Sequence, residues 1–253
     1  LNTVLEKTDY IYGIRAIIEA AEAGREIDKV LVNRDLHGDL ARELMTTLKN
    51  YGILVQKVPV EKIDRITRRN HQGALAILSA VEYTSLAQVV PTIYEEGRLP
   101  FVVLLDGVTD VRNFGAIART CECAGVDAIV IPRRGGVAAT ADAMKTSAGA
   151  LSYLPVCRET SILNAVKFLR DNGFTVFAAT EKASLDYTAP DYAESPVAIV
   201  MGAEDIGISE DVLRFCDTHV AIPQLGHIGS LNVSVAAGVL IYEVVRQRLA
   251  ADK

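Results

Sequence analysis

Cysteine is scarce in this sequence, and no two cysteines form a CxxC pair. The four present, Cys121, Cys123, Cys157 and Cys216, do not make the disulfide framework of a small secreted domain, so we expect reduced thiols and a cytoplasmic location. Cys121 and Cys123 are two positions apart on a predicted helix and therefore point to different faces. We expect them to be packing residues rather than metal ligands.

Long apolar runs and a strong charge of one sign are also missing. No run approaches the roughly 18–20 apolar residues that span a bilayer, and the N-terminus lacks the apolar core of a signal peptide. A composition of 50% apolar and 23% charged residues excludes a disordered chain. The net charge of −6 argues against a protein that coats DNA with a wholly basic surface. The 253 residues suffice for one large domain or two modest ones.

One basic cluster stands out from this acidic background. Within residues 61–71, only two acidic side chains accompany Lys62, Arg65, Arg68, Arg69 and His71. Affinity for nucleic acid depends on local phosphate contacts rather than on net charge. The cluster therefore predicts a patch that captures nucleic acid through Arg65, Arg68, Arg69 and His71, although a solvated helix end is the alternative.

Helical and strand periodicity alternate through the first eighty residues, which indicates a small α/β module. Helices are predicted over 12–23 and 40–50 and strands over 29–33, 53–58 and 74–81, with a short basic helix after the second strand. We predict a domain over 1–83. The proline, glycine and glutamate content that follows predicts a linker over 84–97 with room for one short helix.

The remainder, residues 98–253, predicts a second α/β domain with a mostly parallel sheet covered by helices. Its first strand, 100–107, is continuously apolar, as expected for a parallel strand buried on both faces. Further strands are predicted over 126–132, 152–156, 174–180, 196–202 and 218–223. Helices are predicted to end near Gly125 and to span 138–148, 162–172 and 231–249.

Ligands of open parallel sheets bind beyond the carboxyl ends of the strands, and several common motifs are absent or incomplete there. Gly202–Ser209 has the outline of a phosphate-binding loop, but Ile208 occupies the position of its lysine, which argues against an NTPase. The sequence contains no GxGxxG, which disfavours a nucleotide-binding oxidoreductase. It also contains no GxSxG, HExxH or EF-hand loop.

Three segments that each follow an apolar strand remain: Asp106–Thr120, Val200–Ser209 and Ile222–Arg248. Their patterns NxGAIxRT, GxExxGIS and IP…SLNVSVA resemble, in order and spacing, the three motifs of the SpoU family of RNA 2′-O-ribose methyltransferases, within the SPOUT superfamily. YGIRAIIEA near the start and HQGALA at 71–76 resemble the family's ribosomal-protein-like substrate-binding domain. The likeness covers nearly the whole chain. It is greatest to the large-subunit rRNA guanosine 2′-O-methyltransferases, although tRNA-modifying members share the motifs.

The resemblance implies a deep trefoil knot near the C-terminus, an exception to the rule that chains are not knotted. The second and third motifs would form the knot and bind S-adenosyl-L-methionine there, mainly through backbone groups of Gly202, Ile222 and Leu231. A glycine suits position 202 because its backbone can approach a ligand closely. Simple core packing is the alternative for Ile222 and Leu231. Family members dimerise through the knotted region, and the final helix carries more apolar residues than one sheet face covers, so we expect a homodimer.

The resemblance also implies the catalytic residues Arg119, Asn113, Glu204, Ser230 and Asn232. Methyl transfer from a sulfonium is an in-line displacement that needs no metal, but the ribose hydroxyl must lie about 3–3.5 Å from the methyl carbon. Arg119 matches the family's essential arginine. Because an arginine side chain stays protonated and is a poor base, we expect it to bind an RNA phosphate and to stabilise the forming alkoxide.

Each of these residues has a structural alternative. Asn113 would orient Arg119 or the ribose, or else cap its helix. Glu204 would balance Arg119 or contact RNA, or else be a carboxylate at a helix start. Ser230 and Asn232 would line the ribose pocket, although Ser230 could be an ordinary helix cap. Arg119 itself could be a surface arginine.

Departures from the family pattern concern the RNA target rather than the reaction. Val111 and Arg112 stand where a proline often precedes the motif asparagine, Asp205 replaces a common glycine, and 226–229 is a relaxed version of the family loop. Candidate RNA contacts are Arg112, Arg133, Arg134 and His227. We expect methylation of a ribose 2′-hydroxyl in a guanosine of large-subunit rRNA. The alternatives are a tRNA 2′-O-methyltransferase and a catalytically inactive RNA-binding protein of the same fold; the intact catalytic set favours an enzyme.

Overall fold

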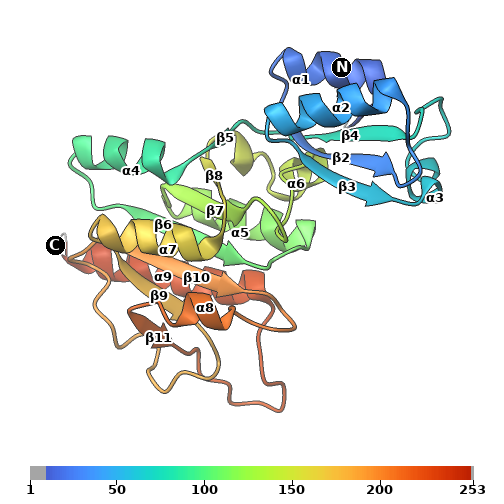
Figure 1. The fold of residues 1–253 in the computed structure, drawn as a ribbon. Helices are drawn as coiled ribbons and strands as arrows, with labels where there is room; N and C mark the ends of the chain where they lie inside the picture. Colours follow the sequence, from blue (N-terminus) through green and yellow to red (C-terminus); the bar gives the residue numbers. More distant parts are fainter. Residues whose placement is uncertain (1–9, 252–253) are drawn as a thin grey trace, which may run out of the picture. The chain divides into compact units, whose positions relative to one another are not determined.

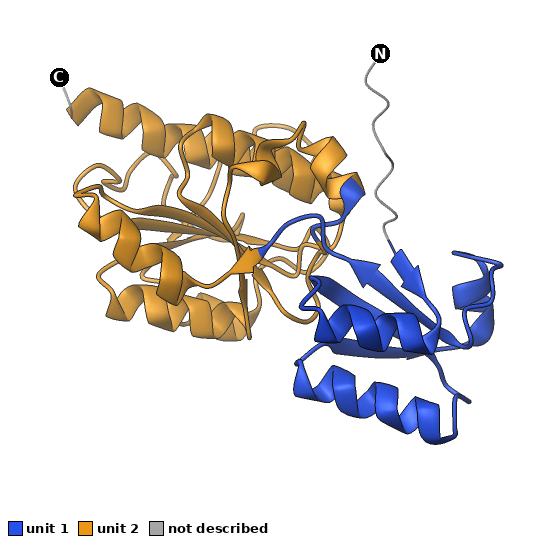
Figure 2. Ribbon diagram, turned by 90° about the horizontal axis from the view of Figure 1, so that it is seen from above, with its two compact units in different colours: residues 1–82, 139–141 blue, residues 83–138, 142–253 orange. Residues whose placement is uncertain are grey.

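The structure, a computed structural model, describes residues 10–251 (Figure 1). The first nine residues of the domain predicted over 1–83, and the last two of the chain, lie outside the described residues. The chain divides into two compact units: unit 1 is residues 1–82 with 139–141, and unit 2 is residues 83–138 with 142–253 (Figure 2). Each unit has its own sheet and its own hydrophobic core.

Unit 1 is built on a mixed four-stranded sheet. In sheet order its strands are β1 (Tyr10–Tyr12), β4 (Ala74–Leu78), β2 (Ile27–Asn33) and β3 (Leu54–Val58), of which only β2 and β3 run parallel to each other. Its helices are α1 (Ile14–Glu22), α2 (Asp39–Asn50) and α3 (Val60–Asp64). Val30 and Val32 of β2 pack with α1 and α2, whereas Leu31 packs with Ile63 of α3. This follows from the two-residue period of a strand, so helices cover both faces of β2.

Unit 2 contains a seven-stranded sheet in which every pairing is parallel, which confirms the predicted fold class. In sheet order its strands are β11 (Thr218–Val220), β9 (Thr175–Ala179), β10 (Val197–Gly202), β6 (Phe101–Asp106), β7 (Ala128–Pro132), β8 (Val156–Glu159) and β5 (Tyr83–Thr84). The helices are α4 (Leu86–Glu95), α5 (Val111–Cys123), α6 (Ala141–Thr146), α7 (Ile162–Asp171), α8 (Glu210–Leu213) and α9 (Val233–Ala251), with a 3-10 turn η1 (Ala150–Ser152).

Helices cover both faces of this sheet, which explains its continuously apolar strands (Figure 1). On one face, α4 and α7 pack against alternate residues such as Val102 and Leu104 of β6. On the other face, α9 packs against both α5 and β10. Residues 101–105 of β6 are therefore all buried, as expected for a central parallel strand. None of the helices within residues 10–251 is long and apolar enough to cross a membrane.

Three local features differ from the predictions. The strand predicted over 152–156 begins only at Val156, because a 3-10 turn follows Gly149, whose φ of +88° suits glycine. The helix predicted from residue 12 begins at Ile14, after strand β1, which the periodicity did not indicate. The segment predicted as a linker contains α4, and its Leu86 and Val90 belong to the core of unit 2. The trefoil knot stays a prediction.

Candidate active site

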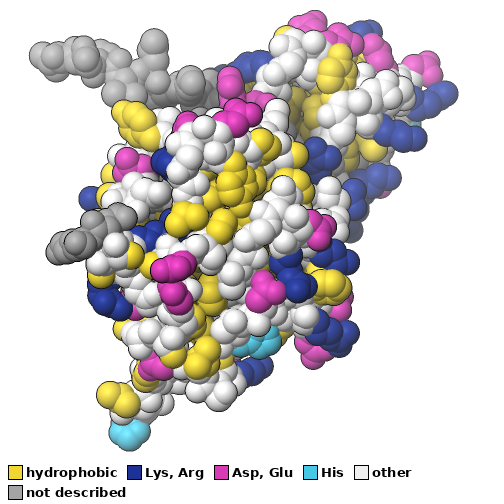
Figure 3. Space-filling model, turned by 90° about the vertical axis from the view of Figure 1, so that its left-hand side faces the viewer, with side chains coloured by type: hydrophobic (Ala, Val, Ile, Leu, Met, Phe, Trp, Pro, Cys, Tyr) yellow, Lys and Arg dark blue, Asp and Glu magenta, His cyan; other side chains and the backbone are white. Residues whose placement is uncertain are grey.

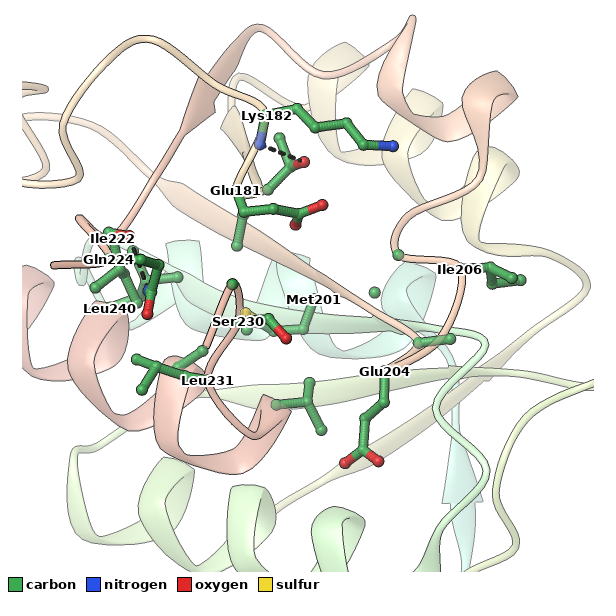
Figure 4. A pocket seen from close by; sticks show the side chains of 18 of the residues that line it. Glu181, Lys182, Met201, Glu204, Ile206, Ile222, Gln224, Ser230, Leu231 and Leu240 are labelled. Carbon is green, nitrogen blue, oxygen red and sulfur yellow. Dashed lines mark hydrogen bonds between the residues drawn. The ribbon is translucent and has the colours of Figure 1, made fainter. Parts of the chain in front are cut away.

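A cavity of about 340 Å³ opens beyond the carboxyl ends of β9, β10 and β11 (Figure 4). Its size lies in the range of roughly 300–1,000 Å³ that is usual for ligand pockets, and ligands of parallel sheets bind at this edge. Ile222, Leu231 and Leu240 form an apolar group at one side. Glu181 and Lys182 extend charged side chains over another side. The cavity can therefore accept a molecule with one apolar and one charged end.

The structure brings most of the predicted site residues to this cavity. Gly202, Ile222 and Leu231, predicted to hold the cofactor, line it, and so do Glu204 and Ser230, predicted to be catalytic. These residues come from the end of β10, from the turn after it and from the segment between β11 and α9. Two motifs that are separate in the sequence therefore form one wall.

The protein's own backbone requires a glycine at position 202. A Cβ atom there would lie 2.3 Å from the backbone of both Gly207 and Ile208, so another residue would displace the turn. The end of this turn is tied to β6, because the backbone N–H of Ser209 donates to Asp106 Oδ2 at 2.7 Å. The reason predicted for this glycine was close approach of a ligand. The structure provides a different reason, the close approach of the turn itself.

Three side chains from the three motifs form a closed hydrogen-bonded cluster beside the cavity. Asn113 Nδ2 donates to Glu204 Oε1. Asn232 Nδ2 lies 3.1 Å from that same oxygen and 3.1 Å from Asn113 Oδ1. These bonds determine which end of each amide faces the cluster. The Asn113–Glu204–Asn232 cluster is thus a hydrogen-bonded polar group at the edge of the cavity that joins all three motifs.

Two helix caps place these amides. Asp110 caps α5, because its Oδ1 accepts two backbone N–H groups at 2.8 and 2.9 Å. Asn113 lies inside the first turn of α5, so the alternative that it caps the helix is wrong. At α9, Asn232 Oδ1 accepts the backbone N–H of Ser234 at 2.9 Å and its hydroxyl at 2.6 Å. Asn232, not Ser230, therefore caps α9, and its Nδ2 is left for the cluster.

Arg119 lies apart from this cluster. Its side chain is exposed on α5 and does not line the cavity. It forms no hydrogen bond or ion pair with the rest of residues 10–251. Arg119 is six positions after Asn113, so the two side chains lie about 120° apart around the helix. Within one chain, therefore, Arg119 does not join the other predicted catalytic residues, and its charge is free to bind a ligand.

The other candidate RNA contacts are exposed as well. Arg112 follows β6, and Arg133 and Arg134 follow β7, at the same edge of the sheet as the cavity. His227 lies in the segment between β11 and α9 that also carries Ser230. Their predicted roles stay predictions.

Among the cavity residues that sequence reasoning missed are two adjacent charged ones, Glu181 and Lys182. The turn that carries them is fixed, because the backbone N–H of Lys182 donates to Thr180 Oγ1 at 3.3 Å and that of Thr180 to the Val220 carbonyl at 3.0 Å. The three motifs do not include this turn. Its position directly after an apolar strand of a parallel sheet is the signal that could have indicated it.

Most of the cysteines are packing residues. Burial raises the pKa of the Cys121 thiol on α5, and it raises the pKa of Cys157 and of Cys216 to about 12. These three thiols therefore stay protonated near neutral pH and are poor nucleophiles. Cys123, which was also predicted to pack, is exposed. Within residues 10–251 no three histidine, cysteine or acidic side chains are placed to hold a metal ion.

The basic segment of unit 1 follows α3. The side chains of Arg65 and Arg68 are exposed and have no hydrogen-bond or ion-pair partner in the described part of the chain. Arg69 Nη1 donates to Tyr12 Oη at 3.2 Å, and its guanidinium carbon lies 5.9 Å from the centre of the Tyr12 ring. The exposed segment therefore carries two arginine side chains without a partner among residues 10–251, Arg65 and Arg68, and a third, Arg69, that contacts the Tyr12 ring.

His71 differs from these arginines. Its side chain is only 11% exposed, and Nε2 lies 2.9 Å from Asp64 Oδ1 while Nδ1 accepts the backbone N–H of Gly73 at 3.0 Å. The neighbouring Gln72 Oε1 accepts the backbone N–H of Ile14 at 3.0 Å and so caps α1. The prediction of His71 as a direct RNA contact is therefore corrected. Both ring nitrogens are used inside unit 1, where they hold the basic segment in place.

Comparison with known proteins matches both units. Residues 100–242 match the SpoU rRNA Methylase family, and residues 10–84 match the family described as RNA 2′-O ribose methyltransferase substrate binding. The chain is 37% identical over 238 residues to a Staphylococcus saprophyticus protein named for the TrmH family of tRNA/rRNA methyltransferases. That alignment covers 94% of this chain and 95% of the relative.

Two solved structures are similar over nearly the whole chain. One is the AdoMet-bound rRNA methyltransferase from Sinorhizobium meliloti, with a TM-score of 0.59 and 26% identity, covering 94% of this chain and 86% of that one. The other is the SpoU methyltransferase AviRb from Streptomyces viridochromogenes in complex with AdoMet. It has a TM-score of 0.59 and 25% identity, and the match covers 95% of this chain and 90% of that one.

Proposed function

The chain belongs to the SpoU rRNA methylase family, and we propose that it transfers the methyl group of S-adenosyl-L-methionine to a ribose 2′-hydroxyl of RNA. The Asn113–Glu204–Asn232 cluster is the observation that carries this proposal. It takes one residue from each of the three motifs and lies where ligands of parallel sheets bind. The AdoMet bound in two similar structures supports the choice of cofactor.

The cavity fits such a cofactor. Its apolar group, Ile222, Leu231 and Leu240, suits a purine, and its charged side suits an amino acid. S-adenosyl-L-methionine supplies, when bound, a methyl carbon activated by a sulfonium. We propose that Ile222 and Leu231 hold its nucleoside, with backbone contacts at Gly202.

The residues around the cavity then have separate tasks. Glu204 holds the amides of Asn113 and Asn232 in fixed orientations, so that these amides and Ser230 position the ribose. Arg119 binds the phosphate next to the reacting ribose and stabilises negative charge on the attacking oxygen. The amides that Glu204 has already oriented need no rearrangement as the reaction proceeds, which favours catalysis.

For the substrate we propose a guanosine of large-subunit rRNA. The similar Sinorhizobium meliloti structure is an rRNA methyltransferase, while the Staphylococcus saprophyticus relative is named for both tRNA and rRNA. Mapping of ribose methylation in rRNA and tRNA from cells with and without the protein tests this choice. Loss of one 2′-O-methylguanosine in large-subunit rRNA is the expected result. Loss from tRNA alone would favour the tRNA methyltransferase, and no loss from either would favour an inactive RNA-binding protein.

We propose that unit 1 captures this RNA through Arg65, Arg68 and Arg69, with His71 holding their segment. The match of residues 10–84 to a substrate-binding family supports this assignment. The domain layout is part of the same proposal: a substrate-binding domain over 1–83 and a knotted SPOUT domain over 98–253, joined by residues 84–97, whose helix α4 packs into the core of unit 2. The cytoplasm is the expected location.

A homodimer completes the proposal. Val235, Tyr242 and Leu249 of α9 are 52%, 50% and 60% exposed, and their seven-residue spacing places them on one face of the helix. Val233, Ala237 and Leu240 are buried against unit 2 itself, so the exposed row is additional apolar surface. Figure 3 shows one face of the molecule, on which hydrophobic side chains lie open to solvent among acidic ones. Apolar surface of this kind favours a partner, here a second copy of the chain.

A further inference from the structure

Two opposite charges at the cavity have no role in the mechanism above. Glu181 and Lys182 both line the cavity, and their side chains extend side by side in the same direction (Figure 4). Neither side chain forms a hydrogen bond or an ion pair with the rest of residues 10–251. Glu204, in contrast, is already engaged by Asn113 and Asn232. The charges of Glu181 and Lys182 are therefore available to a bound molecule.

The backbone beneath this pair is held at both ends. Besides the bonds at Thr180, the carboxyl side of the loop is tied to the segment after β11. The backbone N–H of Ala221 donates to the Leu185 carbonyl at 2.8 Å, and that of Tyr187 donates to the Ala221 carbonyl at 3.0 Å. A backbone fixed in this way loses little freedom when a ligand binds, so only the two exposed side chains have to become ordered.

Resting on the proposed function, we propose that Glu181 and Lys182 bind the amino-acid end of the cofactor. The Glu181 carboxylate accepts hydrogen bonds from the α-ammonium, and the Lys182 ammonium pairs with the α-carboxylate. Adjacent residues of opposite charge match a zwitterion, whose two charges are also adjacent. The apolar group at Ile222, Leu231 and Leu240 cannot take this end, because a charged group would lose its hydration there without a partner.

The test compares two ligands that share a nucleoside. S-adenosylhomocysteine carries the amino-acid end, and 5′-methylthioadenosine lacks it. Calorimetry measures the affinity of each for the wild type, Glu181→Gln and Lys182→Met. We expect S-adenosylhomocysteine to bind each variant about tenfold more weakly, as for loss of a charged hydrogen bond, and 5′-methylthioadenosine to bind all three proteins equally. Glu95→Gln on α4 and Lys49→Met on α2 are exposed charge-matched controls that should change neither affinity.

A third ligand assigns the two charges separately. The decarboxylated analogue of S-adenosylhomocysteine keeps the ammonium and lacks the carboxylate. It should lose affinity in Glu181→Gln and not in Lys182→Met. If a variant loses as much affinity for 5′-methylthioadenosine as for S-adenosylhomocysteine, the substituted side chain binds the nucleoside rather than the amino-acid end. If both variants bind S-adenosylhomocysteine as tightly as the wild type does, neither side chain binds the cofactor. Either result overturns the assignment of Glu181 and Lys182 and leaves the proposed function standing. A wild type that binds none of the three ligands overturns the proposed function.

Discussion

Asn232 Nδ2 lies 3.1 Å from Asn113 Oδ1, although 119 positions separate the two residues in the sequence. The same Asn232 uses its oxygen to cap α9 and its nitrogen to reach Glu204. One amide therefore joins the start of a helix to the proposed catalytic cluster. A substitution that keeps the oxygen of Asn232 and removes its nitrogen separates the capping of α9 from the contact with Glu204.

Asn232→Asp should remain folded and lose methyl transfer. Aspartate is as good a helix cap as asparagine, but it cannot donate to Glu204 and places a second carboxylate beside it. We expect single-turnover transfer to fall roughly 100-fold, in the range found when one oriented donor is removed. Asn232→Ala loses the cap as well and should melt at a lower temperature than Asn232→Asp. Near-wild-type transfer by Asn232→Asp would exclude the cluster from catalysis.

Arg119→Lys should bind S-adenosyl-L-methionine normally and be nearly inactive. Lysine keeps the charge but cannot reproduce the two-pronged contact of a guanidinium with a phosphate. Removal of such an interaction costs about 10²–10³ in rate. Calorimetry and single-turnover transfer on one preparation measure both properties, with Arg42→Lys, an exposed arginine of α2, as the control. If Arg119→Lys transfers as fast as this control, Arg119 is only a surface residue.

Reversal of charge at Arg68 and Arg69 should weaken RNA binding without changing cofactor affinity. Both residues lie in the exposed basic segment, and affinity depends less steeply on salt when fewer phosphates are neutralised. The Arg68→Glu/Arg69→Glu variant is compared with Arg25→Glu/Arg42→Glu, which makes the same charge change elsewhere in unit 1. RNA titrations at several salt concentrations give affinity and slope. Equal RNA affinity of the two double variants at low salt would remove this patch from the account.

Tyr242→Glu should convert the proposed dimer into a monomer. The substitution places a charge in the exposed apolar row of α9, where burial against a second copy would remove its hydration. Light scattering at micromolar concentration measures the mass. Tyr153→Glu is the matched control, because Tyr153 is 81% exposed and lies outside α9. A wild type that is already monomeric would refute the dimer, and a dimeric Tyr242→Glu would place the interface elsewhere.

Individual site residues were predictable because the segments that follow three apolar strands resemble the motifs of a known family. Their meeting was implied by the same resemblance and by nothing local, since it depends on β10 lying next to β6 in the sheet, and no local pattern encodes that neighbour. Capping was ambiguous for the same reason. Asp110 and Asn113 are both good caps, and only the backbone bonds show that Asp110 is used. His71 was assigned to the surface because its burial depends on contacts that α3 and the following turn create.

The central claim is that this protein methylates ribose oxygens of RNA. It is tested most directly by incubating the purified protein with RNA from cells that lack it and with S-adenosyl-L-methionine carrying a deuterated methyl group. The RNA is then digested, and mass spectrometry locates the label in each nucleoside. The account predicts label in the ribose of one nucleoside, with wild-type protein and not with Arg119→Lys. Label in a base, or no label in RNA despite bound cofactor, would contradict it.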